Sequence, residues 1–215
     1  MTTVVLDGRS LTIGEVVAVA REGAEVALAP DAVERIRETR AVVERALERG
    51  DAVYGLTTGV GAKKKVPVRA EEIRAFNRAL VANHLVGAGA DASAEIVRAT
   101  MLRLTNALAS GTPGARPELA QRLVAALNGR EHPRVRLLGS LGQADLPAMA
   151  DLAHGLFGDV ELEAKEALAL VNSNAFSTGM AALAVADTDR QLGAMDVAGA
   201  LDLEAFAANL TLLHP

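Results

Sequence analysis

Apolar residues recur along this chain every three or four positions, the period at which side chains share one face of an α-helix. Six segments carry this pattern and are predicted to be helical: 30–50, 70–85, 94–109, 119–127, 146–157 and 176–200. A shorter helix is predicted from Thr12, and a last amphipathic piece at 201–213. Extended segments at 4–8 and 23–28 predict strands. The pattern indicates a mainly α fold with short N-terminal strands.

Small side chains dominate the predicted helices. The 215 residues are 50% hydrophobic but only 2% aromatic, and alanine is abundant. This hydrophobic content is enough for a sizeable core, and the small side chains favour closely packed helices over a sheet sandwich. The segment 176–200 is rich in Ala, Met and Leu, which suits close packing in a helical bundle.

Charge and composition exclude several classes of function. The net charge is −5, and the one basic run, Lys63-Lys64-Lys65, is short and isolated, so we expect a solvated loop and no nucleic-acid binding. The absence of cysteine excludes disulfides and thiolate chemistry, and the four histidines lack metal-binding spacing, so no metal site is expected. The N-terminus lacks signal-peptide features, and no apolar run approaches the roughly 20 residues of a membrane span. We therefore expect a cytoplasmic protein without membrane contact.

Two glycine-containing loops are the candidates for chemistry. The first, Gly139 to Asp145, reads Gly-Ser-Leu-Gly-Gln-Ala-Asp and leads into the helix that begins at Leu146. Such a loop can present backbone N–H groups and a helix N-terminus to a substrate, with Asp145 as a cap and Pro147 in the first turn. The alternative is an ordinary joint between a loop and a helix.

The second loop, Val53 to Gly61, contains three glycines, two threonines and Tyr54, the single tyrosine of the chain. It matches neither Gly-x-Gly-x-x-Gly nor a loop followed by Lys-Ser or Lys-Thr, so phosphate binding is poorly supported. A tyrosine in such a loop serves either the structure of the loop or a reaction in front of it.

Four segments resemble the aromatic amino acid ammonia-lyases. Residues 54–61 are similar to the family sequence Tyr-Gly-x-x-Thr-Gly-x-Gly, and 78–84 resemble Arg-Asn-Leu-x-x-Ser-His. Residues 106–116 resemble Asn-x-Leu-x-x-Gly-x-Ser-Gly-x-Arg, and 162–172 are close to a segment that contains Lys-Glu-Gly-Leu-Ala-Leu-x-Asn-Gly. The matches follow the family order along essentially the whole sequence. Their specificity is highest in the tyrosine loop and in 162–172.

The resemblance implies the architecture of the chain. We expect the N-terminal portion of an ammonia-lyase-like helical bundle, in which residues 1–160 form an active-site-loop domain and residues 161–215 begin the long-helix bundle. Family members are much longer, and their second half supplies further bundle helices and an arginine that binds the substrate carboxylate. A second chain that supplies this missing C-terminal half is therefore expected, with self-association into a bundle of helices.

The resemblance also implies roles for individual residues. Tyr54 matches a tyrosine that takes part in proton transfer, and His84 matches a histidine near the active centre. Asn172 matches an asparagine that contacts the prosthetic group and the substrate, while Gly61 and Gln143 are further candidate substrate contacts in the two loops. From the residues alone, His84 could equally be a satisfied core histidine and Asn172 a helix cap.

The first loop departs from the family at the point where its prosthetic group forms. The family sequence is Gly-Ser-x-Gly-Ala-Ser-Gly-Asp-Leu, and its Ala-Ser-Gly cyclises into the electrophile methylidene-imidazolone. That reaction needs a serine that loses water and a following glycine whose amide nitrogen attacks. Gln143-Ala144 stands in that place, one residue short and without either group. We therefore expect no methylidene-imidazolone and no other cofactor.

Three functions remain open for such a chain. The first is a lyase-like enzyme that eliminates, isomerises or cyclises a small amino-acid-derived substrate without the prosthetic group, with Tyr54 as base and His84 and Asn172 as orienting groups. The second is a non-catalytic subunit or ligand-binding scaffold of a lyase-like complex. The third is a degenerate fragment without activity, which accounts less well for the intact tyrosine loop.

Overall fold

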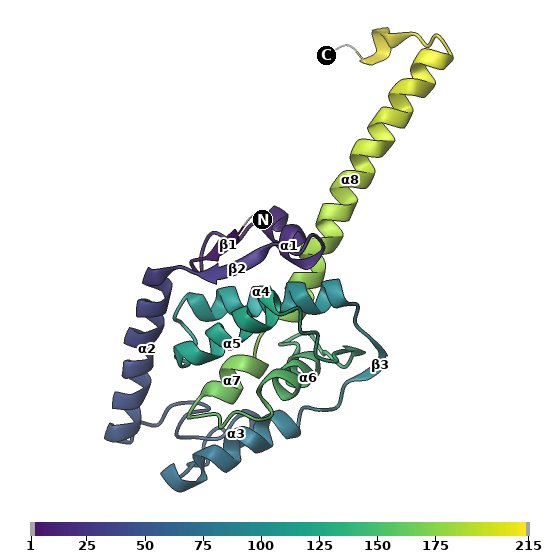
Figure 1. The fold of residues 1–215 in the computed structure, drawn as a ribbon. Coiled ribbons are helices and arrows are strands. Elements are labelled where there is room, and N and C mark those ends of the chain that lie inside the picture. Colours follow the sequence, from purple (N-terminus) through teal and green to yellow (C-terminus); the bar gives the residue numbers. More distant parts are fainter. Residues whose placement is uncertain (1–2, 214–215) are drawn as a thin grey trace.

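The computed structural model describes residues 3–213, and helices make up most of them, as the apolar pattern predicts (Figure 1). The α-helices are α1 Ile13–Ala20, α2 Pro30–Arg49, α3 Ile73–Ala82, α4 Ala94–Ala109, α5 Pro117–Asn128, α6 Leu146–Phe157, α7 Glu166–Val171 and α8 Ala175–Ala205. Short 3₁₀ helices lie at Gly61–Lys63, Ala70–Glu72 and Leu210–Leu213. The fold is mainly α, as expected from the sequence.

Two small sheets accompany the helices. The predicted N-terminal strands, β1 Thr3–Leu6 and β2 Glu25–Leu28, pair in parallel, with Val4 opposite Val26. A second, antiparallel pair, β3 Ala88–Asp91 and β4 Arg136–Leu138, was not predicted. The sequence of β3 is Ala-Gly-Ala-Asp and every one of its residues is exposed, so it has no apolar alternation to reveal it. Its pairing partner comes far along the chain.

Helix α4 lies at the centre of the fold, with α1, α5 and α8 packed around it. Met101, Leu102 and Leu104 are at most 1% exposed, because α4 is apolar on more than one face. Arg98, also buried, donates hydrogen bonds to the carbonyl oxygens of Val19 and Leu127, near the C-terminal ends of α1 and α5. A guanidinium thus satisfies the terminal carbonyl groups of two helices that pack on α4.

Buried polar contacts place α7 against its neighbours. The Asn77 side chain on α3 donates to the Ile73 carbonyl and accepts from the Ala167 backbone N–H at 2.9 Å. Glu166 is fully buried and receives three hydrogen bonds from Arg116, two from the guanidinium and one from the backbone. These bonds hold the first turn of α7 in the body of the fold. The predicted division of the chain at residue 160 stays a prediction.

Helix α8 projects from the body, and only its first part lies beside α4 and α1 (Figure 1). It runs without a break to Ala205, past the end expected at residue 200. Arg21 ties it to the body through Asp187 at 2.6 Å and also pairs with Glu95 at 2.7 Å. Beyond that point several large apolar side chains are exposed: Leu192, Met195, Val197, Leu201 and Phe206.

The same region corrects one expectation about apolar runs. Between residues 3 and 213, one helical stretch, Glu166–Ala205, is long and apolar enough by length and composition to cross a membrane. A single stretch of this kind is weak evidence for a membrane span, because core helices of soluble proteins pass the same test. The expectation that no apolar run approaches this length was therefore wrong, since small residues such as alanine keep hydropathy high without bulky side chains.

Gly179 sets the distance between α8 and α4. A Cβ atom there would lie 3.0 Å from backbone atoms of Ala99 and Thr100, whereas one at Gly193 would meet nothing within 4 Å. We expect Gly179→Ala to lower the free energy of unfolding by about 1–3 kcal/mol through overpacking. We expect Gly193→Ala, on the same helix, to raise it by about 0.5–1 kcal/mol, because alanine is the better helix former. Urea denaturation followed by circular dichroism measures both changes. If the free energy of unfolding changed in the same direction in the two variants, the prediction would be wrong.

Candidate functional site

The loop between α2 and α3 carries Tyr54 at its exposed side. Tyr54 is 46% exposed, and its hydroxyl oxygen accepts a hydrogen bond from the Gly61 backbone N–H at 3.0 Å. Backbone bonds within the loop support this arrangement, from Gly59 to the Val66 carbonyl and from Val68 to the Thr57 carbonyl. Tyr54 and Gly61, two of the predicted site residues, are therefore in direct contact.

A cavity of about 360 Å³ lies between this loop and α3. Val60, Ala62 and Lys63 line it from the loop, Phe76 and Leu80 from α3, and His84 from the turn just after α3. Phe76 and Leu80 are four residues apart, so they project from one face of the helix, and His84 follows four residues later, just past its end. This spacing is visible in the sequence, but Phe76 was not among the predicted site residues. The cavity brings His84 next to the tyrosine loop.

His84 follows the end of α3 and is only partly buried. Its Nδ1 atom lies 2.7 Å from the Leu80 carbonyl oxygen. Because a carbonyl oxygen only accepts, Nδ1 is the donor in this bond. In the neutral ring Nε2 is then an acceptor, and it makes no hydrogen bond to any residue between 3 and 213. Histidine with one ring nitrogen fixed and the other unengaged can orient a ligand or accept a proton.

Asn172 lies in a different place, at the C-terminal end of α7. It is exposed and lines a separate cavity of about 230 Å³ with Lys165, Thr112 and Ser173. Its backbone N–H bonds to the Leu168 carbonyl, but its side chain makes no hydrogen bond within the described residues. Lys165 adopts a left-handed backbone with φ of 74°, which is uncommon for a residue with a side chain. Asn172 and Lys165 thus border the same small cavity.

Leu168 separates the tyrosine loop from the Asn172 cavity. A Cβ atom on Gly55 would lie 2.4 Å from Cδ2 of Leu168, so the loop packs directly on α7 there. Leu168 also lines the cavity that contains Asn172. Within the described residues, Tyr54 and Gly61 contact each other in the loop, His84 lines the cavity between that loop and α3, and Asn172 lies at a separate cavity by α7.

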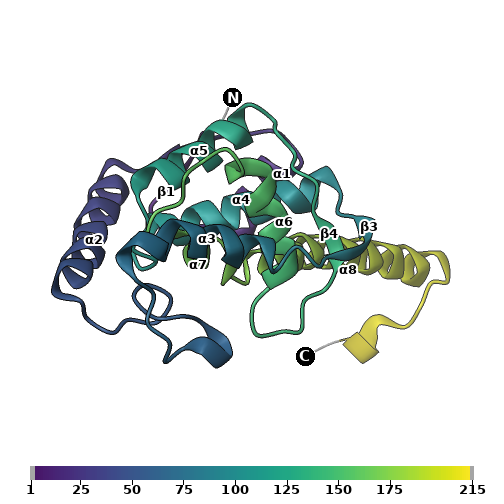
Figure 2. The same cartoon turned by 90° about the horizontal axis from the view of Figure 1, so that it is seen from below.

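The loop from Gly139 to Asp145 emerges on the same side of the molecule as the tyrosine loop (Figure 2). Gly139 and Gly142 have φ of 143° and 100°, which lie in the region that favours glycine. Gln143 is exposed and its side chain has no hydrogen-bond partner among residues 3–213. Gln143 lines neither the His84 cavity nor the Asn172 cavity.

Asp145 is 2% exposed and was expected to cap α6. It stands at the N-cap position, but its side chain makes no bond to that helix. It accepts instead from the Ser140 hydroxyl at 3.0 Å and from the backbone and hydroxyl of Ser177, both at 2.8 Å. The capping prediction was wrong because the first turn of α8, distant in sequence, supplies two donors to the same carboxylate.

The residues of this loop do not fit a methylidene-imidazolone. Ser140 is the loop's single serine, and Leu141 rather than glycine follows it, so the attacking amide would be hindered. The Ser140 hydroxyl donates to Asp145 and accepts from the Gly142 N–H at 3.3 Å. The loop therefore gives no basis for any step through that group.

Two residues near these cavities were missed by sequence reasoning. The basic run at 63–65 is exposed, as expected for a solvated loop, and Lys63 also lines the His84 cavity while Lys64 and Lys65 do not. Lys165 lines the Asn172 cavity, and its left-handed backbone has no signature in the sequence. Charge alone did not reveal which lysines would border a cavity.

The contact between Gly55 and Leu168 allows a test of loop packing. Gly55 and Gly61 both have positive φ, 66° and 56°, but a Cβ at Gly61 would meet nothing within 4 Å. We expect Gly55→Ala to displace the loop, so that trypsin cleaves at Lys63–Lys65 severalfold faster. Gly61→Ala carries similar backbone strain without the clash, and we expect a smaller change. Equal cleavage rates would contradict the close contact.

Comparison with known proteins gives consistent matches. The model of the family described as aromatic amino acid lyase matches residues 11–163 and 158–215. The probable histidine ammonia-lyase of Halobacterium salinarum is 39% identical over 230 residues, covering 95% of this chain and 44% of that protein. The histidine ammonia-lyase of Gloeobacter violaceus is 38% identical over 235 residues, covering 98% and 46%. This chain thus spans about half the length of these curated relatives.

Solved structures agree with the sequence matches. The crystal structure of histidine ammonia-lyase from Trypanosoma cruzi has a TM-score of 0.90 and 28% identity, covering 100% of this chain and 46% of that one. The ergothioneine-degrading enzyme ergothionase from Treponema denticola has a TM-score of 0.80 and 25% identity, covering 84% and 41%. The predicted fold and the resemblance seen in the sequence are confirmed.

Proposed function

We propose, since this chain belongs to the aromatic amino acid lyase family, that it is one part of a lyase-like enzyme which a second polypeptide segment completes. The complete enzyme eliminates, isomerises or cyclises a small substrate derived from an amino acid. It does so in the cytoplasm and without methylidene-imidazolone. Tyr54 is the proposed base, His84 the proposed orienting or proton-transfer group, and Asn172, Gly61 and Gln143 the proposed substrate contacts.

The observation that carries the proposal is the Tyr54 loop beside the His84 cavity. The Gly61 N–H fixes the phenol oxygen at 3.0 Å while nearly half of the residue stays exposed. A purely structural tyrosine gains little from an exposed ring, whereas a base must reach its substrate. Lys63 on the same cavity adds a positive charge that favours a substrate carboxylate.

The proposed absence of the prosthetic group restricts the substrate. Without an electrophile, a primary amine is a poor leaving group, and removal of the neighbouring C–H proton is difficult. A quaternary ammonium group needs no such activation, because it departs as a neutral tertiary amine. Substrates of this class, amino-acid betaines, therefore suit the proposed site better than free histidine. The similarity to an ergothioneine-degrading enzyme supports a substrate outside the free amino acids.

The second segment has a surface on which to assemble. The outer part of α8 exposes Leu192, Met195 and Val197, and Phe206 just after the helix is exposed too; this apolar surface is unusual for an isolated helix in water. We propose that helices of the second segment cover this surface, and that further copies of the chain join the same bundle. In this proposal, residues of the second segment connect the Asn172 cavity with the His84 cavity.

A non-catalytic subunit is the alternative function. It is favoured by the separation of Asn172 from the His84 cavity and by the Asp145 contacts, which fix the loop where the family builds its electrophile. Such a subunit would bind a ligand or stabilise a catalytic partner.

The experiment combines assembly with proton exchange. The chain is produced together with a segment equivalent to the second half of its relatives, and native mass spectrometry reports the complex. Histidine, phenylalanine, tyrosine and the trimethylammonium betaine of histidine are then incubated with it in D₂O. We expect NMR to show C–H exchange or product from the betaine and no ammonia from the free amino acids. An assembled complex that exchanges no probe would establish the non-catalytic alternative. Ammonia release would overturn the restriction on the leaving group.

A further inference from the structure

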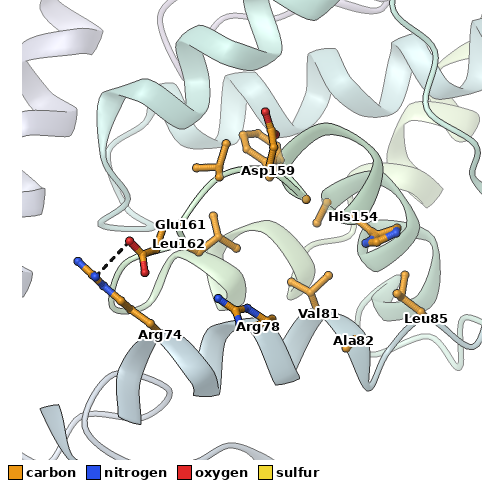
Figure 3. Close-up of a pocket in the computed structure, with 13 residues that line it drawn as sticks. Arg74, Arg78, Val81, Ala82, Leu85, His154, Asp159, Glu161 and Leu162 are labelled. Carbon is orange, nitrogen blue, oxygen red and sulfur yellow. Dashed lines mark ion pairs between the residues drawn. The ribbon is translucent and has the colours of Figure 1, made fainter. Parts of the chain in front are cut away.

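A second face of α3 borders a larger cavity, of about 410 Å³ (Figure 3). Arg74, Arg78 and Val81 line it from α3, at three- and four-residue spacings, and Leu85 lines it from the segment after the helix. The His84 cavity uses the stripe of Phe76, Leu80 and His84 instead. Helix α3 thus separates two cavities, and the larger one shares no lining residue with the proposed catalytic site.

The walls of this cavity are part apolar and part polar, and the apolar part comes from α3, α6 and the segment after α6. Val81 and Leu85 line it together with Phe157 at the end of α6 and Leu162 in the segment that follows. Val81, Phe157 and Leu162 are all buried, so their positions are fixed by packing. The volume falls in the range of cavities that hold small organic molecules, roughly 300–1,000 Å³. The cavity therefore suits a ligand with an apolar body of ring size.

One positive charge at the rim is left unmatched. Arg74 pairs with Glu161 at 3.1 Å and with Glu163 at 3.2 Å, as the dashed line in Figure 3 marks for the first of these. Asp159, the other lining carboxylate, pairs with Arg122 at 2.8 Å. Arg78 makes no ion pair or hydrogen bond with any residue between 3 and 213.

The guanidinium of Arg78 is placed to meet a ligand. The Arg78 side chain lies along the side of α3 that borders the cavity, with Val81 further along the same helix (Figure 3). A guanidinium presents parallel N–H donors that match the two oxygens of a carboxylate. The neighbouring carboxylates of Glu161 and Asp159 do not cancel this attraction, because each is already paired with another arginine.

The geometry points to a binding site for a small organic carboxylate with an apolar ring or branched body. The carboxylate binds Arg78, and the body fills the space between Val81, Phe157 and Leu162. The site goes beyond the proposed catalysis, because none of its residues lines the cavity beside Tyr54. The two cavities lie on different sides of α3 and share no lining residue.

The test measures binding of 3-phenylpropanoate to the full chain, in the complex with its second segment where that forms. Isothermal titration calorimetry gives the dissociation constant. We expect Arg78→Gln to weaken binding by about tenfold, the effect of one charged hydrogen-bonding partner at a partly hydrated rim. Arg45→Gln, an exposed arginine of α2 without an ion pair among residues 3–213, is the matched control and should leave binding unchanged. The alcohol 3-phenylpropan-1-ol has no carboxylate for Arg78 to bind. We therefore expect it to bind weakly, and with the same dissociation constant to the original chain and to Arg78→Gln.

A second variant separates this cavity from the catalytic one. Ala82→Phe fills the cavity from an exposed helical position, and we expect it to abolish binding while the chain stays folded. His84→Gln should have no effect on the dissociation constant. Unchanged binding in Arg78→Gln, loss of binding in His84→Gln alone, or no binding of the carboxylate at millimolar concentration would each overturn the proposal. Because turnover is not measured, failure of the proposed catalysis leaves this result intact.

Discussion

Replacing Arg116 with methionine should lower the free energy of unfolding by about 3–5 kcal/mol, the loss expected when one partner of a buried ion pair is removed. Glu166 is fully buried, and the Arg116 guanidinium contacts its carboxylate at 2.7 Å through both Nε and Nη2. Methionine keeps the apolar stem but leaves a buried charge without its cation. Chemical denaturation at neutral pH measures the loss.

The loss of unfolding free energy in Arg116→Met should depend on pH. A loss caused by packing alone would not. Burial by itself raises the pKa of Glu166, but hydrogen bonds from the Arg116 guanidinium and from the Glu163 and Arg116 backbones outweigh it. The pKa of Glu166 in the folded chain therefore lies below its usual value. Glu166 contributes stability that is fully present above its unfolded pKa of about 4.3 and lost as pH falls through the folded pKa.

Without Arg116, the dominant remaining influence on Glu166 is burial, which raises its pKa. As pH falls from 7 toward 5, Arg116→Met should therefore gain stability relative to the original chain. The difference between their free energies of unfolding should become smaller. Glu166→Gln in the variant should remove this dependence. Arg134→Met, which breaks an exposed pair with Asp91, should cost below about 1 kcal/mol and serves as control. If Arg116→Met also lowered the free energy of unfolding by less than about 1 kcal/mol, this would show that water reaches Glu166.

Replacing Tyr54 with phenylalanine should lower the rate of substrate C–H exchange by about 10²–10⁴-fold, the usual contribution of a general acid or base. The substitution removes one oxygen and retains the ring, so the loop keeps its apolar contacts. The lost hydrogen bond from Gly61 lies at an exposed position, so stability should change little. The measurement is deuterium incorporation into the betaine probe by the assembled complex.

The control for Tyr54→Phe is Lys64→Gln, an exposed change in the segment just after the same loop that borders neither cavity near the loop. It should leave the exchange rate unchanged. The affinity for the probe should also stay within a small factor in Tyr54→Phe, because a base acts on the reaction step more than on ground-state binding. Equal exchange by the Tyr54→Phe complex and the original complex would remove Tyr54 from the mechanism.

The periodic apolar pattern was sufficient for most of the fold. Helices α4 and α6 have the residues that the spacing predicted, since both have strong apolar faces between clear end signals. The region 70–85 was only partly right, because it contains a 3₁₀ turn at 70–72 before α3 begins at Ile73. The antiparallel pair β3–β4 was missed because exposed Ala-Gly-Ala-Asp carries no strand signal of its own.

The candidate site could be predicted as a set of residues but not as an arrangement. Motif similarity selected Tyr54, His84 and Asn172, but the hydrogen bond between Gly61 and Tyr54 was seen only in the structure. That Asn172 lies across Leu168 from the His84 cavity depends on how α7 packs, which residues distant in sequence decide. Asn77 and Arg116 fix that packing through α7, and neither was singled out as a site residue.

The sequence by itself determined the helical class, the family, and the loop that lacks the residues for an internal electrophile, because periodicity and local motifs are properties of neighbouring residues. Only the tertiary structure decided which charges are satisfied. The Asp145 carboxylate accepts hydrogen bonds from Ser177 instead of capping α6, and Arg78 has no partner among residues 3–213 at a cavity rim. Such outcomes depend on burial and on distances between segments far apart in the chain, and composition does not encode them.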